Sequence, residues 1–196
     1  PVEIPERTSS FHGHLSSGMN NCGKVLLILE RYPESIAQFQ ELFALEQYCR
    51  AHPDELGKSG DPKRIDQFWR GRVLDAHDGI AKAHYQWGKR RLNDNQPDLA
   101  MDDFVKSLQH WAIVIDSGEA TDPQRSYLAS SHFHLAIAHR RQGHQSEALA
   151  EYQLAAAMWE PLLADKNRQS FNRQLAESHL YESHVEIKKI QDQLAV

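Results

Sequence analysis

Cysteines, long apolar runs and excess positive charge are all scarce in this sequence of 196 residues. Its two cysteines, Cys22 and Cys49, could form one disulfide bond at most. This excludes the disulfide framework of a small secreted domain and favours free thiols in a reducing cytosol. Unbroken apolar runs such as residues 25–29 are far shorter than the roughly 18 residues that indicate a membrane span. The net charge of −5 argues against binding of nucleic acid through a strongly basic surface.

Motifs of the common catalytic classes are also missing. The sequence has no Gly-rich nucleotide loop, no His-Arg-Asp run and no Asp-Phe-Gly run, so we expect no kinase activity from this chain. A Walker-type phosphate loop and a Gly-x-Ser-x-Gly elbow are likewise absent. We therefore assign no catalytic residue, no cofactor and no metal ligand, and expect any catalytic domain to lie outside this chain.

The opening of the chain is polar and rich in Ser, Gly and His, without a basic-then-apolar signal segment. It starts at Pro1 rather than Met, which indicates processing or a larger parent protein. We predict a flexible segment over residues 1–20, a helical pair over 21–60 and repeats over 61–196. The expected location is cytoplasmic.

What the sequence does contain is helical spacing, because Ala, Leu, Gln, Glu, Arg and Lys fill long windows while β-branched residues are scattered. Four prolines stand where a helix could begin at its first turn. The pattern predicts an all-α chain with helices near 21–31, 33–51, 62–92, 97–116, 123–142, 145–164 and 168–193. The third is long, and Gly71 or Gly79 is expected to break or bend it.

An internal repeat is the most informative feature of the sequence. A shift of 48 residues places His84 on His132 and Trp111 on Trp159, and a further shift of 47 places His132 on His179. Each unit contains two apolar stripes at helical spacing. In the best unit these are Leu128, His132, Leu135, Ala136 and His139, followed by Ala148, Tyr152, Ala155 and Trp159. This pattern predicts antiparallel hairpins in which small Ala136 faces small Ala148, with a turn at Gly143.

These residues resemble the tetratricopeptide repeat (TPR) family. The motif residues are Leu135-Ala136, Gln142-Gly143, Glu147-Ala148-Leu149, Tyr152 and Ala155, with a weaker match at Trp87-Gly88, Ala100, Phe104 and Ser107, where Asn95 replaces the turn glycine. The resemblance covers roughly residues 80–195, and the earlier helices do not fit it well. TPR units are about 34 residues long, whereas these recur at 48 and 47. Long units that open with Leu-Ala-x-Ser-His are similar to arrays attached to bacterial serine/threonine protein kinases.

The resemblance implies an α-α superhelix or solenoid of TPR-like hairpins, about two full hairpins plus a terminal helix, preceded by a helical extension. Such a solenoid would act as an interaction module or scaffold, and here as part of a larger signalling protein. Its first helices line a concave groove that binds a peptide or partner segment. The candidate partner-binding residues on that wall are Lys82, Tyr85, Lys89, Phe133, Ile137, Arg140, Arg141, His184 and Lys188.

Aromatic residues mixed with Arg and Lys are typical of interface anchors, and their positive charge predicts an acidic partner. Tyr85, Phe133 and Leu180 stand at equivalent positions where the carboxylate-clamping TPR subclass prefers Lys or Asn, so the peptide is left unspecified. The opposing interpretation is that Phe133 and Ile137 pack against a neighbouring helix.

Two other functions stay open. A helical metal-dependent enzyme would use His and Asp residues such as His77, His84 and the Asp75–Asp78 run, but no His-x-x-x-His pair supports it. We favour half-buried histidines between hairpins, which would make stability sensitive to mild acid. Asp102 and Asp103 are expected on a solvated helix face. In the second alternative, the chain self-associates as an oligomerisation element of a larger kinase-like protein.

Overall fold

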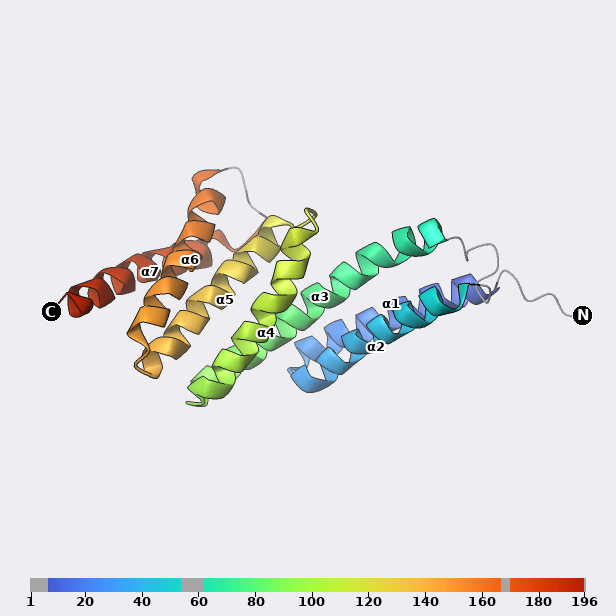
Figure 1. The fold of residues 1–196 in the computed structure, drawn as a ribbon, viewed down its shortest axis with the longest axis horizontal. Coiled ribbons are helices and arrows are strands. Elements are labelled where there is room, and N and C mark those ends of the chain that lie inside the picture. The colour runs from blue at the N-terminus through green and yellow to red at the C-terminus, as the bar shows by residue number, and fades with distance from the viewer. Residues whose placement is uncertain (1–6, 54–61, 167–169, 196) are drawn as a thin grey trace, which may run out of the picture. The chain divides into compact units, whose positions relative to one another are not determined.

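The fold of the chain is all-helical in a computed structural model that describes residues 7–53, 62–166 and 170–195 (Figure 1). The helices in chain order are α1 (Arg7–Ile28), α2 (Tyr32–Ala51), α3 (Pro62–Asn93), α4 (Pro97–Asp116), α5 (Asp122–Arg141), α6 (Gln145–Ala164) and α7 (Arg173–Leu194). Over these described ranges there is no strand, so the all-α prediction is confirmed. None of the described helices has the length and apolar character needed to cross a bilayer.

The largest departure from the predicted helix boundaries is at α1, which begins at Arg7, so residues 7–20 of the segment predicted to be flexible are helical, while residues 1–6 lie outside the described residues. Small residues at one face of α1 allow this helix to lie close to α3. Ser16 is fully buried and accepts a hydrogen bond of 2.9 Å from Nε of Arg72, while Gly13 faces the ring of Phe68. Tertiary packing thus outweighs the low helix propensity of Gly and Ser.

The chain divides into two compact units, residues 1–83 and 84–196, with the division inside α3. The sequence pattern instead suggested a boundary between residues 60 and 61. The difference arises because the first part of α3 packs with α1 and α2. Among its contacts, Asp66 accepts a hydrogen bond from Arg50 and Asp75 accepts one from Asn20. A long helix can therefore belong to two packing units.

Phe39 lies at the centre of the first unit, fully buried between two glycines. A Cβ atom on Gly79 of α3 would lie 2.2 Å from the Phe39 ring, and one on Gly23 of α1 would lie 2.8 Å from it. Of the predicted break or bend at Gly71 or Gly79, the break does not occur, because α3 runs unbroken from Pro62 to Asn93. Gly79 serves instead to admit an aromatic ring against the helix backbone.

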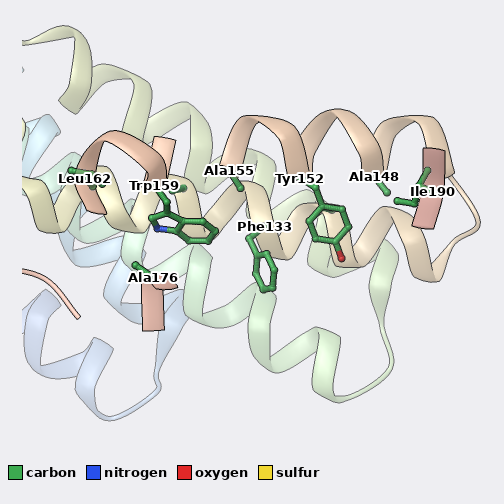
Figure 2. Packing of buried hydrophobic residues seen from close by; sticks show 10 residues of the cluster. Phe133, Ala148, Tyr152, Ala155, Trp159, Leu162, Ala176 and Ile190 are labelled. Atoms are coloured by element: carbon green, nitrogen blue, oxygen red, sulfur yellow. The ribbon is translucent and has the colours of Figure 1, made fainter. Parts of the chain in front are cut away.

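The second unit contains the predicted hairpins. Phe133, Tyr152 and Trp159 pack with small residues Ala148 and Ala155 in one buried cluster between α5, α6 and α7 (Figure 2). The predicted close approach fits the structure, because Ala136 and Ala148 are both fully buried in this cluster. At the two turns the backbone takes left-handed conformations, with φ 81° at Gly143 and φ 58° at Asn95. Asn95 therefore does replace the turn glycine, as its side chain tolerates this region.

One packing pattern recurs in three hairpins. The α1–α2 hairpin is among them, although its sequence does not fit the TPR resemblance well. A small residue near the end of the first helix is followed at offsets of 12, 16 and 19 residues by three further buried residues. The sets are Gly23, Ser35, Phe39 and Leu42; Gly88, Ala100, Phe104 and Ser107; and Ala136, Ala148, Tyr152 and Ala155. In each hairpin, an aromatic ring of the second helix fills the space that a small residue of the first helix leaves open.

Candidate partner-binding surface

The two aromatic residues predicted to face a partner, Tyr85 and Phe133, are buried instead, with exposed fractions of 3% and 2%. Their placement on an open concave surface is therefore wrong. The ring of Tyr85 lies 5.4 Å from that of His134 on α5, and the ring of Phe133 stacks at 4.3 Å on that of His179 on α7. Each aromatic residue thus fills the seam between its own helix and the next first helix of the series.

Ile137 is half-buried and packs against both hydrophobic clusters of the second unit. The alternative that Phe133 and Ile137 pack against neighbouring helices therefore holds for both residues. Because the Phe133 side chain is closed to solvent, it cannot anchor a partner without rearrangement of the core, and Ile137 is only partly accessible.

Three of the predicted cations already have partners within the chain. Lys82 belongs to the first unit and donates to Asp78 across 2.7 Å on the same helix. Arg140 of α5 donates to the carboxylate of Glu186 on α7, and Arg141 donates to the carbonyl of Leu92 on α3. The two arginines therefore hold adjacent helices together and are less available to an acidic partner.

The contacts with cations also affect the pKa of Glu186. Burial by itself would raise the pKa of Glu186, but hydrogen bonds from Lys189 and Arg140 lower it overall. The carboxylate is thus held in its charged form at the interface of α5 and α7, where it compensates two cations.

Lys89 of α3 differs from these residues, because it forms no ion pair with any described residue. Its ammonium lies 5.4 Å from the centroid of the Tyr85 ring. Its charge also lowers the pKa of His134 on α5 and of His179 on α7. Lys89 is therefore close to side chains from all three first helices of the second unit. We call Tyr85, Lys89, His134 and His179 the Lys89 cluster.

The two histidines of the Lys89 cluster are held neutral. Burial is the main cause that lowers the pKa of His134 to about 3, and the nearby His179 and Lys89 lower it further, against a hydrogen bond to the carbonyl of Ser130. Burial followed by the charge of Lys89 lowers the pKa of His179 to about 4. The buried Nδ1 atom of His179 has no hydrogen-bond partner among the described residues.

The electrostatics of the Lys89 cluster favour an anion. Every charged group that shifts the two histidines is basic, and none is a carboxylate. The hydroxyl of Tyr85 keeps its proton, because burial raises its pKa. A carboxylate placed beside Lys89 would find one ammonium and the unpartnered ring nitrogen of His179 in a partly desolvated setting, where such contacts are strengthened.

The two predicted residues on α7, His184 and Lys188, are exposed. They lie on the opposite side of this helix from its buried residues Ala176, Ser183, Glu186 and Ile190. The structure therefore does not bring them together with Lys89. Nε2 of His184 lies 3.3 Å from a carboxylate oxygen of Glu160 on α6, and both side chains are exposed.

Sequence reasoning missed Tyr181, because it used a 47-residue shift for α7. The half-buried His179 and the buried Ser183 and Glu186 correspond in spacing to the buried Ser131, Leu135 and Ala138 of α5, at a shift of 48. With this shift Tyr181, and not Leu180, follows Tyr85 and Phe133 in the series. His134 was missed as well. Its position directly after Phe133 in the sequence could have indicated that it lies near the same seam.

Asp103 was expected on a solvated face, and this is wrong. Its side chain is 1% exposed and binds both Nδ1 of His84, at 2.9 Å, and the guanidinium of Arg91, at 2.6 Å. At the equivalent position of the next hairpin, Glu151 lies 2.6 Å from Nδ1 of His132. These carboxylates explain why histidines recur in the repeat: they join the two helices of each hairpin.

The predicted metal-enzyme alternative gains no support from these positions. Asp78 binds Lys82, and His84 binds Asp103, so the His and Asp residues suggested as ligands have separate partners. The ring of His77 packs on Phe43 at 4.7 Å, and burial lowers its pKa. Across the ranges that the structure describes, no three His, Cys, Asp or Glu side chains converge.

Comparison with known proteins assigns no family to this chain. No protein-family model matches this sequence, and no curated protein is significantly similar to it.

Proposed function

We propose that this chain is a protein–protein interaction module, built as a TPR-like α-α superhelix, which binds an acidic partner segment at the Lys89 cluster. The observation that carries the proposal is the Lys89 ammonium, which forms no ion pair with any described residue, beside two neutral histidines from the next two first helices. The recurrence of one packing pattern in three hairpins supports the repeat architecture.

The chemistry of the cluster specifies the partner's binding group as a carboxylate. Lys89 supplies the charge, and Nδ1 of His179, which has no hydrogen-bond partner among the described residues, can supply a hydrogen-bond donor, whereas Nδ1 of His134 already donates to the carbonyl of Ser130. A bound carboxylate would stabilise the protonated form of His179 and so raise its pKa. By linkage, the acidic segment should bind more tightly as the pH falls toward the pKa of the bound histidine.

We place this module in a larger bacterial signalling protein of the kinase-associated kind, acting as a non-catalytic scaffold in the cytoplasm. Support comes from the Leu-Ala-x-Ser-His openings at residues 128–132 and 175–179 and from two cysteines that are free in the structure. The catalytic domain of such a protein would lie outside this chain.

A matched pair of peptides tests the proposal. One peptide carries a central run of Glu, and the other has Gln at the same positions, with all else identical. We expect the Glu peptide to shift the NMR resonances of the His134 and His179 rings and to raise the pKa of His179, while the Gln peptide does neither.

Two lysine variants supply the control. Lys89→Met should abolish the response to the Glu peptide, whereas Lys106→Met, at an exposed position of α4, should leave it intact. Equal responses to both peptides, or an undiminished response in Lys89→Met, would show that the cluster does not bind carboxylates. If the Glu peptide binds as expected, a lysate protein that the wild type retains and Lys89→Glu does not retain would be the natural partner.

A further inference from the structure

The outer face of α7 has no covering helix among the described residues. Four exposed side chains at helical spacing define this outer stripe, namely Glu177, Tyr181, His184 and Lys188. The Tyr181 side chain is 73% exposed, compared with 43% for Tyr48, the other large aromatic residue that is exposed among the described residues. A single exposed hydrophobic side chain is ordinary at a protein surface, so the repeat position of Tyr181 and the charges around it are what indicate a contact site.

The repeat itself shows what kind of element covers this position. Tyr85 on α3 is the equivalent of Tyr181 two repeats earlier, and Phe133 on α5 is its equivalent one repeat earlier. Both earlier rings are buried against the next first helix, at His134 and His179 respectively. Tyr181 therefore stands where an aromatic residue is normally covered by another α-helix.

The charges of the outer stripe are complementary to those of a second, antiparallel copy of the same stripe. A two-fold axis passing α7 between residues 182 and 183 places Glu177 opposite the partner's Lys188. The same axis places Tyr181 opposite the partner's His184. Each pair occurs twice because the axis exchanges the copies, and helices packed about 8–10 Å apart bring such side chains into contact.

We propose that two copies of this chain associate through α7, packed antiparallel about this axis. The central contact is then the Tyr181 ring against the imidazole of the partner's His184, flanked by two intermolecular Glu–Lys pairs. The stripe lies on the opposite side of α7 from His179, so this association is independent of the Lys89 cluster and goes beyond the proposed function.

The contacts that these residues make within one chain are compatible with association. Glu177 accepts a hydrogen bond of 3.1 Å from Arg173, and a carboxylate has room for a second donor. His184 pairs with Glu160 across 3.3 Å, with both side chains more than half exposed. Exposed pairs of this kind contribute little and can rearrange. Lys188 has no ion-pair partner among the described residues.

Charge reversal tests the antiparallel register. We expect the mass of the wild type, measured by sedimentation equilibrium, to rise from monomer to dimer with concentration. Lys188→Glu or Glu177→Lys alone places like charges opposite each other at both symmetric contacts and should weaken the dimer at least tenfold. In a mixture of the two single variants every reversed charge faces its opposite, so heterodimers should form.

Two controls separate this result from altered net charge or misfolding. Lys106→Glu on α4 changes the net charge as Lys188→Glu does and should dimerise like the wild type. The double variant Glu177→Lys with Lys188→Glu should also dimerise, and all variants should give the same helical circular dichroism. A wild type that stays monomeric at every concentration, or a mixture of single variants that stays monomeric, would overturn the proposal.

Discussion

The Nδ1 atom of His84 lies 2.9 Å from Oδ1 of Asp103, and the same offset of 19 residues joins His132 to Glu151 one repeat later. Each pair links the two helices of one hairpin: the histidine lies near the middle of the first helix, and the carboxylate lies on the second helix. Their environments differ, because the Asp103 side chain is 1% exposed and that of Glu151 is 20% exposed.

Removal of the buried carboxylate should be far more costly than removal of the exposed one. Asp103→Ala leaves Arg91 and His84 without their shared acceptor, so we expect the free energy of unfolding to fall by about 3 kcal/mol. Glu151→Ala should lower it by about 1 kcal/mol. Urea unfolding followed by circular dichroism measures both, and equal losses would argue against the burial of the Asp103 network.

Two glycines of α3 should respond oppositely to the same substitution. Gly79→Ala puts a methyl group 2.2 Å from the ring of Phe39, and we expect it to lower the free energy of unfolding by about 2 kcal/mol. Gly71→Ala meets no atom within 4 Å, so the better helix propensity of Ala should stabilise the protein by about 0.5–1 kcal/mol. Stabilisation by both substitutions, measured by thermal melting, would contradict the close approach of Phe39.

Two aromatic residues at equivalent repeat positions provide a test of the core. Phe133→Ala removes a ring that contacts Tyr152, Trp159 and His179, and should lower the free energy of unfolding by about 3–5 kcal/mol. Tyr181→Ala removes an exposed ring and should change it by less than about 0.5 kcal/mol in the monomer. Chemical unfolding at low protein concentration compares them, and similar losses would place Tyr181 in the core. Phe133 variants are accordingly unsuitable for testing partner binding.

Acid should destabilise the second unit through His134 and His179. Their folded-state pKa values of about 3 and about 4 lie below the ordinary value of 6.5, so the unfolded chain binds protons that the folded chain does not. Stability is then complete above about pH 6.5 and falls as the pH drops toward 4. One pKa unit corresponds to about 1.4 kcal/mol, so the roughly 2.5 units between pH 6.5 and 4 set an upper limit of about 3.5 kcal/mol for the loss through His134, and partial exposure of His179 makes its share smaller.

The melting temperature as a function of pH measures this loss. His179→Gln should reduce the slope between about pH 6.5 and 4 without abolishing it, because His134 remains, whereas His52→Gln, at an exposed position of the first unit, serves as the control. An equal slope in the wild type and His179→Gln would mean that His179 is not held neutral in the folded state.

Helix positions were predictable where the chain carries local signals. Pro62, Pro97 and Pro123 stand at or next to helix starts, and Gly143 and Asn95 adopt the left-handed backbone that their residue types permit. The start of α1 carried no such signal. Gly and Ser there are helical because they allow close packing on α3, which only contacts distant in sequence can reveal.

The candidate site was predictable only in part. Lys89, at the centre of the Lys89 cluster, was anticipated from its repeat position and basic charge. Its histidine neighbours depend on how three helices pack, and a one-residue error in register rotates a helix by about 100°. That error replaced Tyr181 by Leu180 and concealed the outer stripe of α7.

By itself, the sequence determined the all-helical class, the hairpin turns and the small and aromatic residues that fill each hairpin, because these depend on local propensity and spacing. Only the tertiary structure decided which side of each helix is covered. Burial of Tyr85, Phe133 and Asp103, and exposure of Tyr181, follow from the presence or absence of a neighbouring helix, and no local pattern carries that information.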